Sequence, residues 1–406
     1  MYNDDVKYLR DMAWKIREFS LSRENEIIIK RWRDVTAMRR PDRMPVYTFP
    51  SGAVWDEIIP EDSYKCPPGF LRELEFTLRG RLYKIFVGDD TTQTPFYPVH
   101  AVYDVRPANT WGVDINNHMP DRKGGAWAFN PPIAELEDFS KLQVPEFTYN
   151  AEETARRIEE VNEVLGDILP AKFRNYNLLP LSHAAQAAML RGLENMLIDI
   201  KAEPEFLHKL MEYITESILK SMDTLEETGL ITPNTEGDHD YVGYCDPVGE
   251  PDQDGKYTLK NCWYFADSQE FEPVSPRDWE EFSLSHQKKI FERYGLIHYG
   301  CCERLEKKVD KVMTIPNLRM IAASHFTNLR KLVDRTGDKY VIQWRPSPIN
   351  LIFGYKEKML AELSEGAEIL KGVQTQIMMR SVETLGGNPN LQKEWTELAK
   401  DFAVRI

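Results

Sequence analysis

The feature that most constrains the fold is a regular alternation of strand-like and helix-like segments in the second half of the chain. Five short apolar runs, at 261–267, 296–300, 317–324, 339–346 and 374–381, are separated by segments of helical or turn character. These runs are mostly apolar throughout, which is typical of strands buried on both faces of a parallel sheet. The alternation predicts an α/β fold, and its length favours a (β/α)8 TIM barrel over an open sheet.

The first half of the chain is expected to complete this barrel. Residues 1–40 have the pattern of an N-terminal helical extension, and the barrel is predicted to span 41–406, with further strands at 44–49 and 177–182. Apolar spacing of about 3.6 residues predicts helices between the strands. The clearest are 151–168, 184–200, 205–225, 279–295, 302–313 and 391–402.

One segment, at about 236–261, interrupts the alternation. It is rich in Gly, Asp and Pro and has no helical period. An insertion of this length in a barrel is typical of a functional lid, and its aromatic residues favour an ordered one. We therefore predict a lid-like insertion and include its Tyr244 among the candidate substrate-binding residues.

Charge and composition exclude several classes of function. Lys and Arg number 51 against 65 Asp and Glu, a net charge of −14, and such a surface repels nucleic acid. The N-terminal residues lack an apolar signal region, and no stretch is long and apolar enough to cross a membrane. Five scattered cysteines do not form a disulfide framework, so reduced thiols and a cytoplasmic location are expected. Nucleotide-binding glycine motifs are absent.

Polar residues follow the predicted strands, at the end where TIM barrels carry their active sites. If the barrel is correct, these side chains converge on one cavity although they lie far apart in sequence. Two aromatic residues within the first of the strands are expected to line the same cavity. The candidates are Trp263, Phe265, Asp267, Glu270, His298, Cys301, Cys302, Glu303, Gln343, Trp344, Arg345 and Glu383.

The strand end HYGCCE combines three kinds of side chain that bind zinc. A catalytic zinc takes three protein ligands and leaves one position open, and His298 with Cys301 and a ligand from another strand would supply them. On an extended strand His298 and Cys301 point to opposite faces, so joint ligation requires the chain to turn at Gly300. A hydrogen-bonded structural histidine and cysteines that act as small apolar residues are the alternative.

Two further groups admit both a chemical and a structural interpretation. Asp267 and Glu270 could form an acid/base pair, or could cap a helix and be solvated at the surface. Arg345, which precedes the turn-forming sequence PSP, could bind a substrate carboxylate or form a structural ion pair.

Three sequence segments resemble the uroporphyrinogen decarboxylase superfamily. They are RRPDRMPV at 39–46, the strand end LIHYG, and MRSVETLGGNPNLQKEWTELAKD at 379–401. The similarity extends over most of the chain from about residue 25 and is strongest after 260. The superfamily contains two functional branches on one (β/α)8 barrel, the metal-free decarboxylase of heme synthesis and zinc methyltransferases that exchange methyl groups with a corrinoid protein.

The residues favour the methyltransferase branch. The decarboxylase signature has an arginine-rich MRQAGR segment after the first strand, where this chain reads PVYTFPSGAVWDE. The methyltransferases carry a His-x-Cys motif where this chain reads HYGCC, so His298 matches and the motif cysteine falls at Gly300. The resemblance then implies Cys301 or Cys302 as the thiolate ligand and Glu383 in place of a late cysteine.

The resemblance implies a zinc-dependent methyltransferase that acts with a corrinoid carried by a partner protein. A site with histidine, cysteine and carboxylate ligands suits a methyl ether better than a thiol. The implied general acids are Asp267, Glu270 and Glu303, and Trp263, Phe265, Gln343, Trp344 and Arg345 would contact the substrate. A homodimer is the default for such barrels. The alternatives are a metal-independent decarboxylase or lyase that acts on a small carboxylate, and a binding protein without catalysis.

Overall fold

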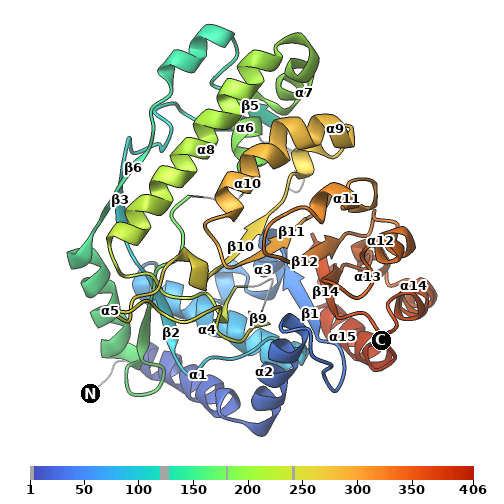
Figure 1. Cartoon of the computed structure of the whole chain (residues 1–406). Helices are drawn as coiled ribbons and strands as arrows, with labels where there is room; N and C mark the ends of the chain where they lie inside the picture. Colours follow the sequence, from blue (N-terminus) through green and yellow to red (C-terminus); the bar gives the residue numbers. More distant parts are fainter. Residues whose placement is uncertain (1–3, 119–127, 180–181, 240–242) are drawn as a thin grey trace.

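The computed structural model describes residues 4–118, 128–179, 182–239 and 243–406. Its centre is a six-stranded parallel sheet with the strand order β1-β14-β13-β12-β11-β10 (Figure 1). In that order the strands are Val46–Pro50, Thr375–Val382, Val341–Trp344, Leu318–Ala323, Leu296–Tyr299 and Trp263–Ala266. Most of their residues are buried, as expected for strands covered on both faces.

A second parallel pair, β2 (Tyr97–His100) and β7 (Ala171–Arg174), lies outside this ladder. Single hydrogen bonds connect it indirectly to the main sheet. The Thr232 N–H donates to the Asn175 carbonyl at 2.8 Å, and the Asn234 side chain pairs with both backbone groups of Trp263 at 2.8 and 3.0 Å. A side-chain amide thus replaces a strand ladder next to β10. The parallel α/β sheet is confirmed, whereas the described residues form half a barrel rather than a closed ladder of eight strands.

Within the described ranges, three small antiparallel strand pairs lie outside the main sheet. In each pair a connecting segment reverses the chain direction between the two strands. They are β3 (Tyr103–Arg106) with β6 (Glu146–Tyr149), β4 (Asn116–His118) with β5 (Ala128–Asn130), and β8 (Glu236–His239) with β9 (Gly243–Tyr244).

Helices surround the sheet, and none in the described part of the chain is long and apolar enough to cross a membrane. The α-helices after β1 are α3 (Gly52–Ile58), α4 (Phe70–Val87), α5 (Ala151–Leu165), α6 (His183–Arg191), α7 (Leu193–Ala202), α8 (Pro204–Glu227), α9 (Pro276–Trp279), α10 (Ser285–Phe291), α11 (Val309–Val312), α12 (Leu329–Thr336), α13 (Pro348–Ile352), α14 (Lys356–Ile369) and α15 (Leu391–Ala403). Short 3-10 turns are η1 (Glu61–Ser63), η2 (Leu136–Lys141), η3 (Leu259–Asn261), η4 (Gln269–Phe271) and η6 (Leu305–Lys307), and η5 (Glu280–Leu284) is a π-helical turn between α9 and α10.

The N-terminal segment forms two helices, α1 (Asp4–Ser20) and α2 (Arg23–Thr36), at the bottom of the view in Figure 1. Helix α2 begins at the Ser22 cap, whose side chain accepts from the Asn25 N–H. Its Trp32 indole packs edge-on against Tyr47 of β1, with ring centroids 6.0 Å apart. Arg31 forms an ion pair with the buried carboxylate of Asp90. These contacts attach the helices firmly to the sheet.

The insertion at 236–261 contains a hairpin rather than an unstructured loop. Its described residues contact α2 and the amino ends of the strands: Asp246 pairs with Arg39 at 2.8 Å, and Arg33 lies over the Tyr244 ring at 5.2 Å. Gly295, just before β11, leaves no room for a Cβ beside Lys260 O and Val248. The sequence predicted a lid-like insertion, and these contacts place its described residues at the amino ends of β10 and β11.

Several predicted elements differ from the structure, among them the helix at 184–200, which is divided at Gly192 into α6 and α7. The predicted strand at 177–182 is displaced to β7 at Ala171–Arg174; its residues 177–179 form a loop whose Leu179 packs into the core, and 180–181 lie outside the described residues. The predicted helix at 302–313 is replaced by the 3-10 turn η6 from Leu305 and the four-residue helix α11; before them the Glu303 carboxylate accepts from the Cys301 N–H and holds a turn.

Candidate active site

The site is built on a sharp turn at the carboxyl end of β11. Gly300 has φ +109°, a conformation that residues with a side chain rarely adopt, and its N–H still donates to the Ala266 carbonyl at 2.8 Å. An added Cβ would lie 2.6 Å from Leu305 Cδ1 and 3.1 Å from Ala322 Cβ. The turn predicted from the sequence is therefore present, and it directs Cys301 and Cys302 out of the strand register.

Cys301 and Cys302 form a pair of neighbouring thiols. Cys301 contacts Arg345, which follows β13, and Cys302 contacts Ser381 of β14. Their Sγ atoms are 3.7 Å apart, and the Arg345 guanidinium lies 3.5 Å from Cys301 Sγ. The hydrogen bond from Cys301, together with the positive charge of Arg345 and a bond from Ser381, lowers the pKa of Cys302 to about 7. The pKa of Cys301 is raised by the same thiol contact and by burial. One shared proton between the two sulfur atoms accounts for both directions.

A buried chain of polar side chains crosses the sheet behind the thiols. Gln343 Oε1 accepts from Arg345 at 3.1 and 2.6 Å and lies 3.3 Å from His298 Nε2, while Gln343 Nε2 donates to Gln376 Oε1 at 3.0 Å. The His298 ring is therefore joined through Gln343 to the Arg345 guanidinium. Arg345 also donates to the Cys301 carbonyl at 2.8 Å, so its guanidinium is held rigidly at the turn.

Three carboxyl groups lie at the ends of β10 and β11. Burial, followed by the charges of Glu303 and Glu270, raises the pKa of Asp267 to about 7, although Ser182 Oγ donates to it at 3.0 Å. Burial likewise raises the pKa of Glu270, whose Oε2 has no hydrogen-bond partner within the described residues. Glu303 instead accepts from the Ser268 and Cys301 N–H groups at 3.1 and 2.8 Å. The acidic group therefore contains two carboxyl groups whose pKa is raised by burial, Asp267 and Glu270, beside a third that accepts two backbone hydrogen bonds.

Lysine 308 adds a buried cation near these carboxylates. Its Nζ donates to the Phe271 carbonyl at 2.7 Å, and burial lowers its pKa to about 8 while the charge of Glu303 opposes this shift. Lys308, Ser182 and Ser381 were not predicted from the sequence. Ser182 caps α6, Lys308 lies between η6 and α11, and Ser381 lies near the end of β14. Gln376 could have been predicted from the sequence, since it is a polar residue within the apolar run TQIMM.

The predicted aromatic residues do not gather at one wall. Phe265 lies beside His298, with ring centroids 5.5 Å apart, whereas the Trp263 indole donates to Cys245 Sγ at 3.1 Å. Trp344 follows Gln343 in β13 and so points to the other face of the sheet, where it packs against Gly366 of α14. Its ring leaves no space for a Cβ at Gly366, with ring atoms 2.2 to 2.8 Å from the ideal position.

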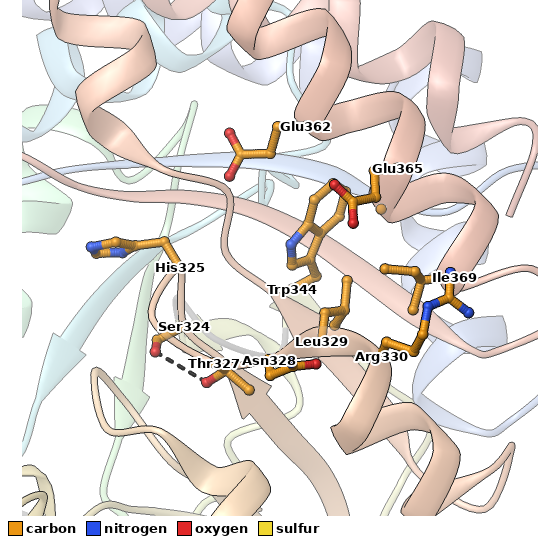
Figure 2. A pocket seen from close by; sticks show the side chains of 11 residues that line it. Ser324, His325, Thr327, Asn328, Leu329, Arg330, Trp344, Glu362, Glu365 and Ile369 are labelled. Carbon is orange, nitrogen blue, oxygen red and sulfur yellow. Dashed lines mark hydrogen bonds between the residues drawn. The ribbon is translucent and has the colours of Figure 1, made fainter.

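Trp344 instead lines a cavity of about 270 Å³ between α12 and α14 (Figure 2). Ser324 and His325, at the end of β12, form another wall, and Glu362 and Glu365 of α14 lie above the indole. The Ser324 hydroxyl donates to the Glu303 carbonyl at 3.3 Å, so this cavity adjoins the acidic group.

The four predicted zinc ligands do not assemble in one group. Two thiolates on one tetrahedral zinc lie about 3.8 Å apart, since each Zn–S bond is about 2.3 Å, and the cysteine pair matches this spacing. His298 Nε2, however, is hydrogen-bonded to Gln343 rather than grouped with other ligands, and Glu383 is exposed, with Ser51 Oγ 3.3 Å from its Oε2. Within the described ranges, no three His, Cys, Asp or Glu side chains are grouped to hold a metal. The arrangement does not fit a three-ligand zinc site, and zinc stays a prediction.

Comparison with known proteins identifies a fold relative. No protein-family model and no curated protein sequence matches the chain. Among solved structures, a methyltransferase from Methanosarcina mazei is similar with a TM-score of 0.54 and 13% sequence identity. The alignment covers 92% of this chain and 98% of that one. At this identity the likeness shows a shared fold over nearly the whole length of both proteins.

Proposed function

We propose that the protein is a methyltransferase that transfers a methyl group from a small methyl ether to a corrinoid carried by a partner protein. The observation that carries the proposal is the likeness to the Methanosarcina mazei methyltransferase, which extends over 92% of this chain. A shared fold alone is an analogy about function. The residues at the carboxyl ends of β10 and β11 supply the chemical argument, and the resemblance to the uroporphyrinogen decarboxylase superfamily agrees with it.

The acidic group favours an oxygen leaving group. When the ether C–O bond breaks, the methyl carbon passes to the acceptor and the electron pair stays on oxygen. An alkoxide or phenoxide is a strong base and benefits from a proton donor, whereas a thiolate leaves without one near neutral pH. Asp267, whose pKa is raised to about 7, holds such a proton at neutral pH, and Ser182 fixes its orientation. Asp267 is therefore the proposed general acid.

The remaining site residues have positioning roles in this proposal. The corrinoid of the partner would supply the centre that accepts the methyl group. The cysteine pair is the proposed location of zinc, but the described residues provide no complete ligand set and no reaction step is assigned to the metal. Arg345, already bonded to Gln343 and the Cys301 carbonyl, holds the thiol turn. Because these hydrogen bonds already occupy its guanidinium, Arg345 is poorly placed to bind a substrate carboxylate, as the decarboxylase alternative requires.

The proposal is tested with cob(I)alamin as the acceptor and methoxybenzoates as methyl donors, under anaerobic conditions. We expect wild-type protein to form methylcobalamin, followed by its absorbance, and to release one phenol per methyl group. The Asp334→Asn variant removes an exposed carboxylate of α12, away from the site. It should keep wild-type activity and serves as the control for substitutions of the site carboxyl groups. Release of carbon dioxide from the benzoate without methylcobalamin would contradict the proposal and favour the lyase.

Arg345→Met is expected to weaken the thiol turn. Loss of the guanidinium removes the bond to the Cys301 carbonyl and the charge near Cys301 Sγ, so the thiolate population of the pair should fall. We expect the rate of alkylation by iodoacetamide at pH 7 to drop by about tenfold, the change that one pKa unit gives. Arg335→Met, on the exposed face of α12, is the control and should leave the rate unchanged. An unchanged rate in Arg345→Met would show that Arg345 does not act on the thiols.

A further inference from the structure

We propose that Cys301 and Cys302 are a modification site at which a hydroperoxide forms a reversible disulfide between neighbouring residues. This inference goes beyond the proposed methyl transfer and rests on the geometry of the thiol pair alone. The two Sγ atoms are 3.7 Å apart, and both side chains are only partly buried. A disulfide needs about 2.05 Å between the sulfur atoms, so side-chain rotation with a small adjustment of the turn would have to close the remaining distance.

Access distinguishes this pair from the other cysteines of the chain. Cys66, Cys245 and Cys262 are 1%, 4% and 0% exposed. Cys245 accepts from the Trp263 indole, and Cys262 contacts the Thr232 carbonyl, so both are held within the packed core. A small hydroperoxide can therefore reach the pair at 301–302 far more readily than these three thiols.

The surroundings of the pair favour its reaction. The Arg345 guanidinium lies 3.5 Å from Cys301 Sγ and donates to the Cys301 carbonyl at 2.8 Å, so it holds the turn that keeps the two sulfur atoms adjacent. Gly300, at φ +109°, already turns the chain immediately before the pair. A disulfide between adjacent residues closes a strained eight-membered ring, and strained disulfides are readily reduced. The product would therefore be reversible rather than structural.

The reaction balances with the hydroperoxide as the only oxidant. One thiolate attacks the outer peroxide oxygen, the O–O bond breaks, and the second oxygen leaves as an alkoxide or hydroxide that takes up a proton. The resulting sulfenic acid is attacked by the second thiol; the S–S bond forms, the S–O bond breaks, and water leaves with the thiol proton. Two cysteines are oxidised and one peroxide is reduced. The disulfide would remove both thiols from the proposed zinc location.

Peptide mapping tests this inference independently of any catalytic assay. Trypsin cleaves after Arg293 and Arg304 and places both thiols in the single peptide YGLIHYGCCER. After brief exposure of the folded protein to hydrogen peroxide, followed by alkylation under denaturing conditions, we expect this peptide to lose both alkylation sites and two hydrogens. Dithiothreitol added before alkylation should restore both sites. The peptides that contain Cys66, Cys245 and Cys262 should be alkylated fully in every sample.

Single substitutions separate disulfide formation from simple oxidation. Cys301→Ser and Cys302→Ser each leave one thiol, which should stop at the sulfenic acid and be trapped by dimedone, with thermal unfolding as the check on folding. Two alkylated cysteines after peroxide treatment of the wild type would overturn the inference. Sulfinic or sulfonic products without a disulfide would overturn it as well, because they show that the second thiol does not reach the first.

Discussion

Gly300→Ala is expected to destabilise the protein by about 3–5 kcal/mol, combining backbone strain with a steric clash. The backbone at Gly300 has φ +109°, and an alanine Cβ would lie 2.6 Å from Leu305 Cδ1 and 3.1 Å from Ala322 Cβ. Both neighbours are buried, so neither can move without opening the core. Urea unfolding followed by tryptophan fluorescence measures the change in the free energy of unfolding.

Gly69→Ala is the matched control for this substitution. Gly69 has a similar φ of +121°, but nothing lies within 4 Å of its ideal Cβ position. The control therefore carries the backbone strain without the clash, and we expect it to cost about 1–3 kcal/mol. Equal losses for the two variants would show that the contacts with Leu305 and Ala322 relax freely. The turn that positions the thiols would then be less constrained than its packing indicates.

The sequence predicted the repetitive part of the fold well. The strands β10 to β14 were predicted because each is a short apolar run buried on both faces. Such a run can be recognised from the residues of the strand itself. β7 was displaced because Leu178 and Leu179 pack against the core from a loop, while the true strand AKFR has two charged residues. The position of the insertion was not predictable, because its composition indicates only a loop and its contacts with α2 decide which end of the sheet it meets.

The residues at the strand ends of the candidate site were predicted, but their hydrogen-bond partners from other elements were not. Asp267, Glu303, the two cysteines and Arg345 lie together because parallel strands bring their carboxyl ends to one edge. Whether a residue faces inward depends on strand register, and a difference of one position separates Gln343 from Trp344. Partners such as Ser182, which starts α6, contact the site only through the packing of a helix against the sheet. No local pattern in the sequence contains that information.

Asp267→Asn is expected to have opposite effects on activity and stability. The asparagine keeps the shape and the oxygen that accepts from Ser182, but it cannot donate the proton that the proposed leaving group needs. Removal of a general acid typically lowers the rate by about 10² to 10⁴-fold. We therefore expect methylcobalamin formation from a methyl ether to fall by at least about 100-fold, with little change in KM.

The pH dependence of the rate follows from the same proton. Because the pKa of Asp267 is raised to about 7, the acid form is present below that pH and is lost as the pH rises above it. Wild-type kcat/KM should therefore decline above pH 7, and the residual rate of Asp267→Asn should lack this decline. A more activated ether, whose leaving phenol is already acidic, needs the donor less and should recover much of the lost rate. No such recovery would argue against a role as general acid.

The stability of the same variant provides an independent test. Asp267 has a folded-state pKa of about 7, above the value of about 3.9 for an unfolded aspartate. The folded protein binds the proton more tightly, so this carboxyl contributes its full stabilisation below pH 4 and loses it as the pH rises through 7. At pH 8 the Asp267 carboxylate of the wild type is buried and repelled by Glu303 and Glu270, whereas a neutral asparagine at this position is not.

We therefore expect Asp267→Asn to be more stable than the wild type at pH 8, by about 1–3 kcal/mol after allowance for the partial exposure of the carboxyl group. The difference should shrink toward zero near pH 4, where both side chains are neutral, and urea unfolding at the two pH values measures it. A variant that is less active and more stable only at high pH would identify a strained, proton-bearing carboxyl group, as a site for acid catalysis requires. A variant destabilised equally at both pH values would instead make Asp267 a structural partner of Ser182 and remove the proton donor from the proposed reaction.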